Sequence, residues 1–62
     1  MYTMKEVIGV STAGFSDAVR NAIRQFPKDS GTPAWFEVIE KRGTVRDDDV
    51  FEYQVKLSVG VK

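Results

Sequence analysis

Hydrophobic positions along the chain follow two different periods, and each predicts a different kind of element. The clearest alternation covers residues 50–62, where one face carries Phe51, Tyr53, Val55, Leu57, Val59 and Val61. The other face is mainly polar, with Glu52, Gln54, Lys56, Ser58, Gly60 and Lys62. Strict alternation of this kind is typical of a strand with one buried face. Residues 3–10 alternate more weakly and predict a further short strand, while Tyr53 is expected in the core.

Between these strands the apolar positions take a helical period. They fall at i, i+3, i+4, i+7, i+8 and i+11 and are Phe15, Ala18, Val19, Ala22, Ile23 and Phe26. This makes one apolar stripe on a helix that packs against a sheet. Ser11 and Thr12 carry side-chain oxygens suited to capping the start of the helix. Pro27 is expected to end it, because proline lacks the N–H and its ring opposes helical geometry at the preceding residue.

The segment 28–33 is rich in turn-forming residues and returns the chain to the sheet. Residues 34–45 predict the middle strand in sequence order, and a polar turn at Asp47, Asp48 and Asp49 leads into the strand 50–62. Ca²⁺ and Mg²⁺ prefer oxygen ligands, but three consecutive carboxylates cannot converge on one ion from an extended turn, so we expect no metal site. The sequence therefore predicts an α+β fold of order β-α-β-β over residues 1–62. One helix would cover one face of a three-stranded antiparallel sheet.

Size and composition add an expectation of self-association. A chain of 62 residues buries only about 60% of its unfolded surface, against about 1.5 kcal/mol of conformational entropy per ordered residue. The sequence contains no cysteine and no histidine. Disulfides, thiolate metal sites and the commonest general base are thereby excluded. An uncovered sheet face and free edge strands then favour a symmetric homo-oligomer.

The charge balance argues against several partners. The chain has 9 Lys plus Arg and 9 Asp plus Glu, without the basic excess that phosphate contacts require of a nucleic-acid binder. No apolar run approaches the roughly 20 residues that span a bilayer, and the N-terminus lacks the apolar core of a signal peptide. We therefore expect a soluble, cytoplasmic protein that binds neither nucleic acid nor membrane. The dinucleotide and P-loop glycine patterns are also absent.

One pair of residues points to a ligand. Trp35 precedes Gln54 by 19 positions, and the two lie on strands predicted to be neighbours. An indole offers a flat, electron-rich face, and a glutamine amide offers donors and an acceptor. Together they suit a planar heteroaromatic ring, held by stacking and by hydrogen bonds at its edge. The alternatives are an aromatic anchor in a subunit interface and an ordinary solvent-facing glutamine.

The order and spacing of several short runs resemble the dodecins over nearly the whole chain. These runs are Gly9-Val10-Ser11, Trp35-Phe36-Glu37-Val38, Arg42-Gly43-Thr44, Glu52-Tyr53-Gln54-Val55 and Val59-Gly60-Val61. Dodecins are small flavin-binding proteins with a β-α-β-β fold that assemble as hollow, roughly spherical dodecamers. The resemblance implies that flavins bind as stacked pairs between symmetry-related subunits.

The resemblance also implies a role for each site residue. Trp35 would cover the isoalloxazine face, and Gln54 would hydrogen-bond its polar edge. Glu40 would lie near the ribityl hydroxyls, while Arg42 and Lys62 would reach the phosphate of FMN, with riboflavin or FAD as other possible ligands. The implied activity is storage, sequestration and photoprotective quenching of flavin without turnover. Charged residues at strand ends are more often simply solvated, which is the alternative for Glu40, Arg42 and Lys62.

The chain departs from the family pattern in two places. Pro27 and the segment 29–33 replace what is usually a continuing helix, so the helix is expected to be shorter, and Ala34 stands where an acidic residue is common. A second hypothesis is a ligand-free or ion-binding scaffold with the same shell, although the presence of Trp35 argues against it. A small enzyme is disfavoured because the chain has no histidine or cysteine.

Overall fold

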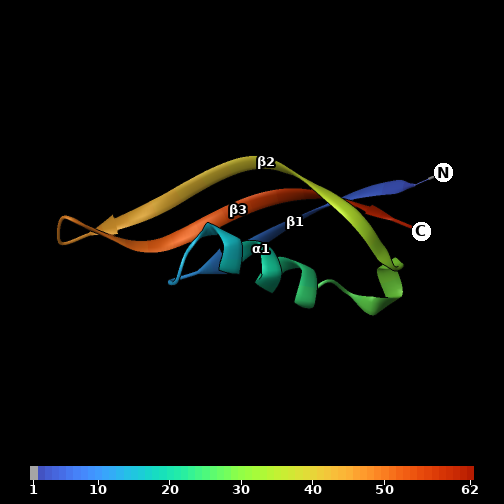
Figure 1. Cartoon of the computed structure of the whole chain (residues 1–62), viewed down its shortest axis with the longest axis horizontal. Helices are drawn as coiled ribbons and strands as arrows, with labels where there is room; N and C mark the ends of the chain where they lie inside the picture. The colour runs from blue at the N-terminus through green and yellow to red at the C-terminus, as the bar shows by residue number, and fades with distance from the viewer. Residues whose placement is uncertain (1) are drawn as a thin grey trace.

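The computed structural model describes residues 2–62 and has the β-α-β-β order expected from the sequence (Figure 1). In chain order the elements are β1 (Thr3–Ser11), α1 (Phe15–Arg24), the single 3-10 turn η1 (Lys28–Ser30), β2 (Pro33–Arg46) and β3 (Asp49–Val61). The sheet order is β1-β3-β2, and both pairings are antiparallel. This confirms the predicted fold class. Neither helix within residues 2–62 has the length and apolarity needed to cross a bilayer.

Helix α1 packs on one face of the sheet and leaves the other face uncovered. The core joins Ala18, Ala22 and Phe26 to the apolar face of β3, formed by Val55, Leu57, Val59 and Val61. The helical stripe and the alternation of β3 are therefore both confirmed. Tyr53 is half-buried at the edge of this core, where its ring meets Phe15 edge-on with 5.0 Å between the centroids. The β2–β3 hairpin continues well beyond the helix (Figure 1), in a subunit measuring 45 × 18 × 14 Å.

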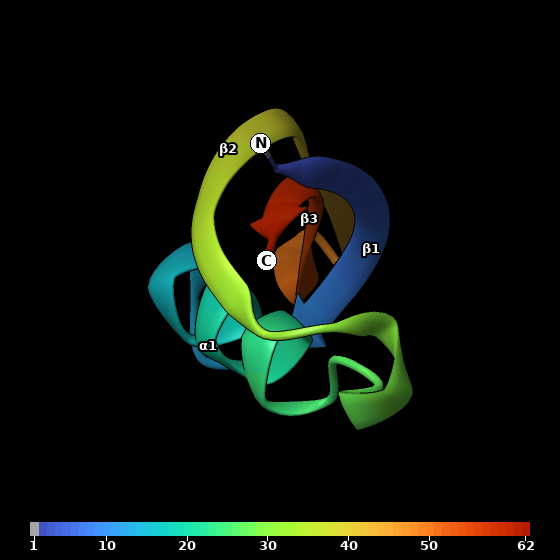
Figure 2. The same ribbon diagram turned by 90° about the vertical axis from the view of Figure 1, so that its right-hand side faces the viewer.

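Small residues bring α1 very close to β1. A Cβ added to Gly9 would lie 2.1 Å from the carbonyl oxygen of Ala18 and 2.7 Å from Cβ of Ala22. These distances are far below van der Waals contact, so no side chain fits at position 9. The end-on view in Figure 2 shows the helix against one side of the curved sheet. The close approach fixes the sheet face on which the helix lies, and hence which face stays open.

The start of α1 differs from the sequence-based expectation. The helix begins at Phe15, and its N-cap is Gly14, which makes no side-chain capping hydrogen bond. Ser11 Oγ instead accepts a hydrogen bond from the backbone N–H two residues later (2.9 Å) and donates one to Asp17 Oδ2 (2.7 Å). The expectation that Ser11 or Thr12 caps the helix was therefore wrong. The Ser11 hydroxyl therefore ties the end of β1 to the first helical turn. The three residues between Ser11 and Phe15 carry the change of chain direction.

The remaining connections follow the predicted turn chemistry. Helix α1 ends at Arg24, ahead of Pro27, as expected. Gly31 has φ 110°, a backbone conformation that favours glycine. At the hairpin tip Asp47 and Asp48 have φ 52° and 62°, the left-handed values of a two-residue type I′ turn. This turn matches the right-handed twist of the strands and allows β2 and β3 to pair up to their ends.

Candidate ligand site on the open face of the sheet

The sheet face opposite α1, called here the open face, carries nearly all the candidate residues. Directly opposed residues of antiparallel strands point to the same side of a sheet, so the β1-β3-β2 register defines this face in rows. From the end near both termini, the rows are Met4–Gly60–Trp35, Glu6–Ser58–Glu37, Ile8–Lys56–Glu40 and Val10–Gln54–Arg42. The open face therefore holds Trp35, Glu40, Arg42 and Gln54 together on one surface.

Trp35 lies at the end of the open face near both chain termini. Trp35 is 45% exposed. The indole lies against its cross-strand neighbour Gly60, where an added Cβ would come within 2.3 Å of the indole Nε1. The ring of Tyr2 meets the indole edge-on, with 6.1 Å between centroids and an interplanar angle of 86°. The indole is thus supported from below and from one side, and it still presents a surface to a ligand.

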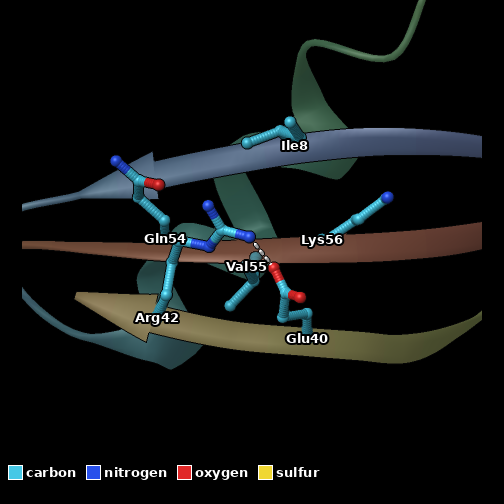
Figure 3. A pocket seen from close by; sticks show the side chains of 6 residues that line it. All are labelled: Ile8, Glu40, Arg42, Gln54, Val55 and Lys56. Carbon is cyan, nitrogen blue, oxygen red and sulfur yellow. Dashed lines mark hydrogen bonds and ion pairs between the residues drawn. The ribbon is translucent and has the colours of Figure 1, made fainter.

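Glu40, Arg42 and Gln54 meet in a hollow farther along the open face (Figure 3), which has a volume of about 120 Å³. Ile8, Val55 and Lys56 also line this hollow. The Arg42 guanidinium points along β2 to Glu40, and its Nη2 donates a hydrogen bond to Glu40 Oε1. This bond and the positive charge of Arg42, with a further contribution from Lys56, hold the pKa of Glu40 below its ordinary value. Glu40 is therefore an ionised hydrogen-bond acceptor at neutral pH.

Other polar groups of this face are held by neighbours on the same surface. Gln54 Nε2 donates to Glu52 Oε1 at 3.0 Å, which fixes the orientation of the amide. Lys56 Nζ lies 3.4 Å from Glu6 Oε1 in an ion pair between β3 and β1. Both contacts are at least partly exposed, so they contribute little to stability. Their main effect is to set the directions in which these side chains point.

The structure does not bring Trp35 and Gln54 of one chain together. The cross-strand partner of Trp35 is Gly60, six residues beyond Gln54 on β3. At 3.2–3.4 Å per strand residue this separation is about 20 Å, longer than three fused six-membered rings. The hollow beside Gln54 is also smaller than the roughly 300 Å³ at which ligand pockets usually begin. A flavin-sized site that uses both residues must take them from different subunits.

Lys62 lies at the same end of the sheet as Trp35. It follows the last residue of β3, and its side chain is exposed. Its backbone N–H donates to the carbonyl oxygen of Thr32 at 3.1 Å. Arg42 pairs with Gln54, so Arg42 and Lys62 of one chain lie roughly eight strand residues, or about 27 Å, apart. Within one subunit the candidates thus form two groups, one at each end of the open face.

Sequence reasoning missed three participants in this surface. Gly60 supports the indole, Glu52 holds the Gln54 amide, and Lys56 contributes to the charge around Glu40. Only Gly60 left a signal in the sequence, since a glycine inside an alternating strand often marks a close approach. Within residues 2–62 no three Asp or Glu side chains are grouped as metal ligands. The three aspartates near the hairpin tip lie in or beside the turn.

Comparison with known proteins places this fold and surface in a family. The family model described as Dodecin matches residues 1–62. A dodecin of Thermus thermophilus is 39% identical over 62 residues, which cover all of this chain and 90% of that one. The solved dodecin from Streptomyces davaonensis superposes with a TM-score of 0.91 at 33% identity, covering 98% of this chain and 90% of the other. For the Streptomyces coelicolor dodecin the TM-score is 0.90 at 38% identity, covering 98% and 87%.

The chain therefore belongs to the dodecin family. The resemblance seen in the sequence is confirmed along its full length. Dodecins are non-enzymatic, which confirms the expectation that this chain is not an enzyme. Family membership also implies a homo-oligomeric shell, and flavin binding is a trait of the family.

Proposed function

We propose that this dodecin is a flavin-storage protein that binds FMN between the subunits of a dodecameric shell and quenches its excited state. The observation that carries the proposal is the half-exposed indole of Trp35, held against the backbone of Gly60 on a sheet face that no element of its own chain covers. Such a surface suits a flat aromatic ligand. The family membership supplies the ligand class, and the cytoplasmic location expected from the sequence stays a prediction.

The spacing of the candidate residues supports this assignment. Solved variants of the Thermus thermophilus dodecin replace a tryptophan by phenylalanine and replace, by alanine, arginines 7 and 27 residues after it. In this chain Arg42 and Lys62 follow Trp35 by the same 7 and 27 residues. Lys62 thus stands where that protein has an arginine. Lysine is a point charge without the bidentate fork of arginine, so Lys62 would hold a phosphate by charge alone.

The chemistry of the open face matches the parts of FMN in turn. Offset stacking on an indole adds about 0.5–1.5 kcal/mol beyond burial for each contact. The Gln54 amide suits the ring edge, where donors and acceptors alternate. Glu40 accepts hydrogen bonds from ribityl hydroxyls because it is ionised, while Arg42 and Lys62 supply positive charge for the phosphate. The Trp35 end and the Gln54 end of the open face lie about 20 Å apart in one chain. They form one site where the Trp35 end of one subunit meets the Gln54 end of another.

Quenching follows from direct contact between the indole and the flavin. Tryptophan readily donates an electron to an excited isoalloxazine stacked on it, and rapid return of the electron restores both rings unchanged. No bond is made or broken, and the process needs no general base or nucleophile. Photosensitised damage by free flavin would fall accordingly.

The test is a titration of FMN fluorescence with the flavin-stripped protein, with riboflavin alongside. The native protein should quench FMN stoichiometrically, and Trp35→Ala should lose most of the quenching while the oligomer remains intact. Phe51→Ala is the matched control, because Phe51 is also an exposed aromatic (40%) but lies near the hairpin tip under Arg46.

The outcomes separate the possible functions. Normal quenching by Trp35→Ala would refute stacking at this residue. Equal affinity for riboflavin and FMN would refute the phosphate roles of Arg42 and Lys62. An oligomer that leaves FMN fluorescence unchanged would instead support the ligand-free scaffold.

A further inference from the structure

The contact between Trp35 and Gly60 defines how the indole lies on the sheet. A Cβ built on Gly60 would lie 2.3 Å from Nε1, 2.6 Å from Cε2 and 2.9 Å from Cδ1 of the indole. All three are atoms of the five-membered ring. Position 60 is buried, although it belongs to the open face, because the indole covers it.

These distances show that the indole lies face-down on Gly60. If the Cβ position approached Nε1 in the ring plane, the two neighbouring ring atoms would each be about 1 Å farther away than Nε1, given ring bonds of roughly 1.3–1.5 Å. They are only 0.3 and 0.6 Å farther. The position of the missing side chain is therefore above the ring face, close to Nε1. One face of the indole rests on the backbone of β3, and the opposite face points away from the sheet.

We infer that Gly60 is the positioning residue of the flavin site, because the absence of its side chain allows the indole to lie flat and present one whole face for stacking. This inference rests on the proposed function and adds the residue that sets the stacking plane. Real Cβ atoms essentially never approach another atom closer than 3.0 Å, and ordinary contact begins at 3.4 Å, so a side chain at position 60 displaces Nε1 by roughly 0.7 to 1.1 Å. An indole lifted away from the sheet leaves less room for the flavin ring stacked on it. A tilted indole no longer lies parallel to that ring.

Other reasons for a glycine at this position are weak. The φ of Gly60, unlike that of Gly31, lies outside the left-handed region that side chains rarely adopt, so alanine can also adopt the backbone conformation of Gly60. The face of β3 that packs on α1 is formed by other residues, such as Leu57 and Val59. The three heavy atoms nearest to the Cβ position at residue 60 all belong to the Trp35 side chain. Alanine there therefore perturbs the indole before it perturbs the core.

The experiment uses the fact that Trp35 is the sole tryptophan of the chain, so intrinsic fluorescence reports on this side chain alone. Gly60→Ala is compared with the native protein and with Gly14→Ala, where an added Cβ meets nothing within 4 Å. In the flavin-free oligomer Gly60→Ala should shift the emission to longer wavelength and increase quenching by acrylamide. FMN binding should weaken roughly tenfold, which corresponds to about 1.4 kcal/mol. Gly14→Ala should match the native protein in all three measurements.

The outcomes separate this inference from the proposed function. If the native protein binds FMN, and Gly60→Ala leaves both the indole fluorescence and the affinity unchanged, Gly60 is not the positioning residue. If the native protein does not bind FMN, the proposed function fails, and the role of Gly60 in a flavin site fails with it. The indole fluorescence would then still report whether Gly60 supports Trp35.

A second variant covers the case in which Gly60→Ala fails to assemble. Alanine at position 35 removes the ring atoms that make the short contacts, so adding Trp35→Ala should restore assembly. A double variant that remains unassembled would overturn the inference, because the defect would then lie in the strand and not under the indole.

Discussion

Subunit mixing tests the main consequence of the geometry, which is that each flavin takes its indole and its amide from different chains. The two variants are Trp35→Ala and Gln54→Ala, each of which removes one half of the proposed site. Within one chain Gln54 and Gly60, the residue opposite Trp35, are six residue steps apart along β3, or about 20 Å. Neither variant alone can form an intact site, whatever the arrangement.

The arrangement decides what happens when the two variants share a shell. If Trp35 and Gln54 come from different subunits, random assortment of the two chains in equal amounts gives about a quarter of the sites with both residues intact in a closed symmetric oligomer. If both residues came from the same chain, every site would lack one of them. The expected recovery is therefore about a quarter of the native stoichiometry of tight FMN binding, compared with none.

The assay is stoichiometric quenching of FMN fluorescence by shells refolded from an equimolar mixture of the denatured variants. Each variant refolded alone supplies the baseline, and the two preformed shells mixed without denaturation control for signals that do not need shared shells. Recovery that appears only after co-refolding supports a site between subunits. Failure to recover tight sites in co-assembled shells, verified by mass spectrometry, would refute the assignment of Trp35 and Gln54 to one flavin.

Two further predictions follow from single contacts. Gly9→Ala should destabilise the fold by about 3 kcal/mol or more, at or beyond the upper end of the usual cost of overpacking, because its Cβ would lie 2.1 Å from the backbone oxygen of Ala18. Chemical denaturation checks this value, and a loss within the range of an ordinary surface substitution would contradict the close packing of α1 on β1. For Glu40, whose folded-state pKa Arg42 lowers, the stabilisation by the pair is present above the unfolded pKa and is lost as pH falls through the folded pKa. NMR titration should find that Arg42→Ala raises the pKa of Glu40 towards its ordinary value, whereas an unchanged titration curve would mean that the pair does not persist in solution.

Periodic elements were predictable from the sequence, and the details that depend on register were not. The stripe from Phe15 to Phe26 and the alternation from Phe51 to Val61 each repeat over several turns or residue pairs, so they indicate the helix and the central strand directly. The start of α1 was missed because Ser11 forms its hydrogen bonds with the first helical turn while Gly14 occupies the cap. Side-chain oxygens near a helix start do not reveal which backbone group they will meet.

The distance between Trp35 and Gln54 could also not be predicted from the sequence pattern. Both residues lie on neighbouring antiparallel strands. Their separation of 19 positions along the chain does not show which residue of one strand lies opposite which residue of the other, because that depends on where the turn lies. The turn at Asp47 and Asp48 opposes Arg42 to Gln54 and leaves Trp35 opposite Gly60. The sequence therefore marks the two residues as candidates, and only the register shows that one chain cannot hold a single ring between them.

A β-bulge places the two groups of candidate residues on the same face. With unbroken alternation along β2, Trp35 and Glu37 would share a face with Ile39, and Glu40 and Arg42 would point towards the helix. The register instead shifts between Val38 and Glu40, because Val38 pairs with Leu57 and Glu40 pairs with the next residue, Lys56. One extra residue, Ile39, thus reverses the side of every later residue on β2.

The β-bulge at Ile39 affects both the residues that pack on the helix side and the candidate ligand site on the open face. Before the bulge, Val38 lies opposite the buried Leu57, and after it, Lys41 lies over the ring of Phe15 on the helix side, with Nζ 5.5 Å from the ring centroid. The same shift directs Glu40 and Arg42 onto the open face with the indole. Without the bulge the Glu40–Arg42 pair would have to fit beside the helix, and the open face would lack the carboxylate and the guanidinium proposed to meet the ribityl chain and the phosphate. The bulge is therefore the local feature that allows one strand to supply both the stacking group and the polar group of the proposed flavin site.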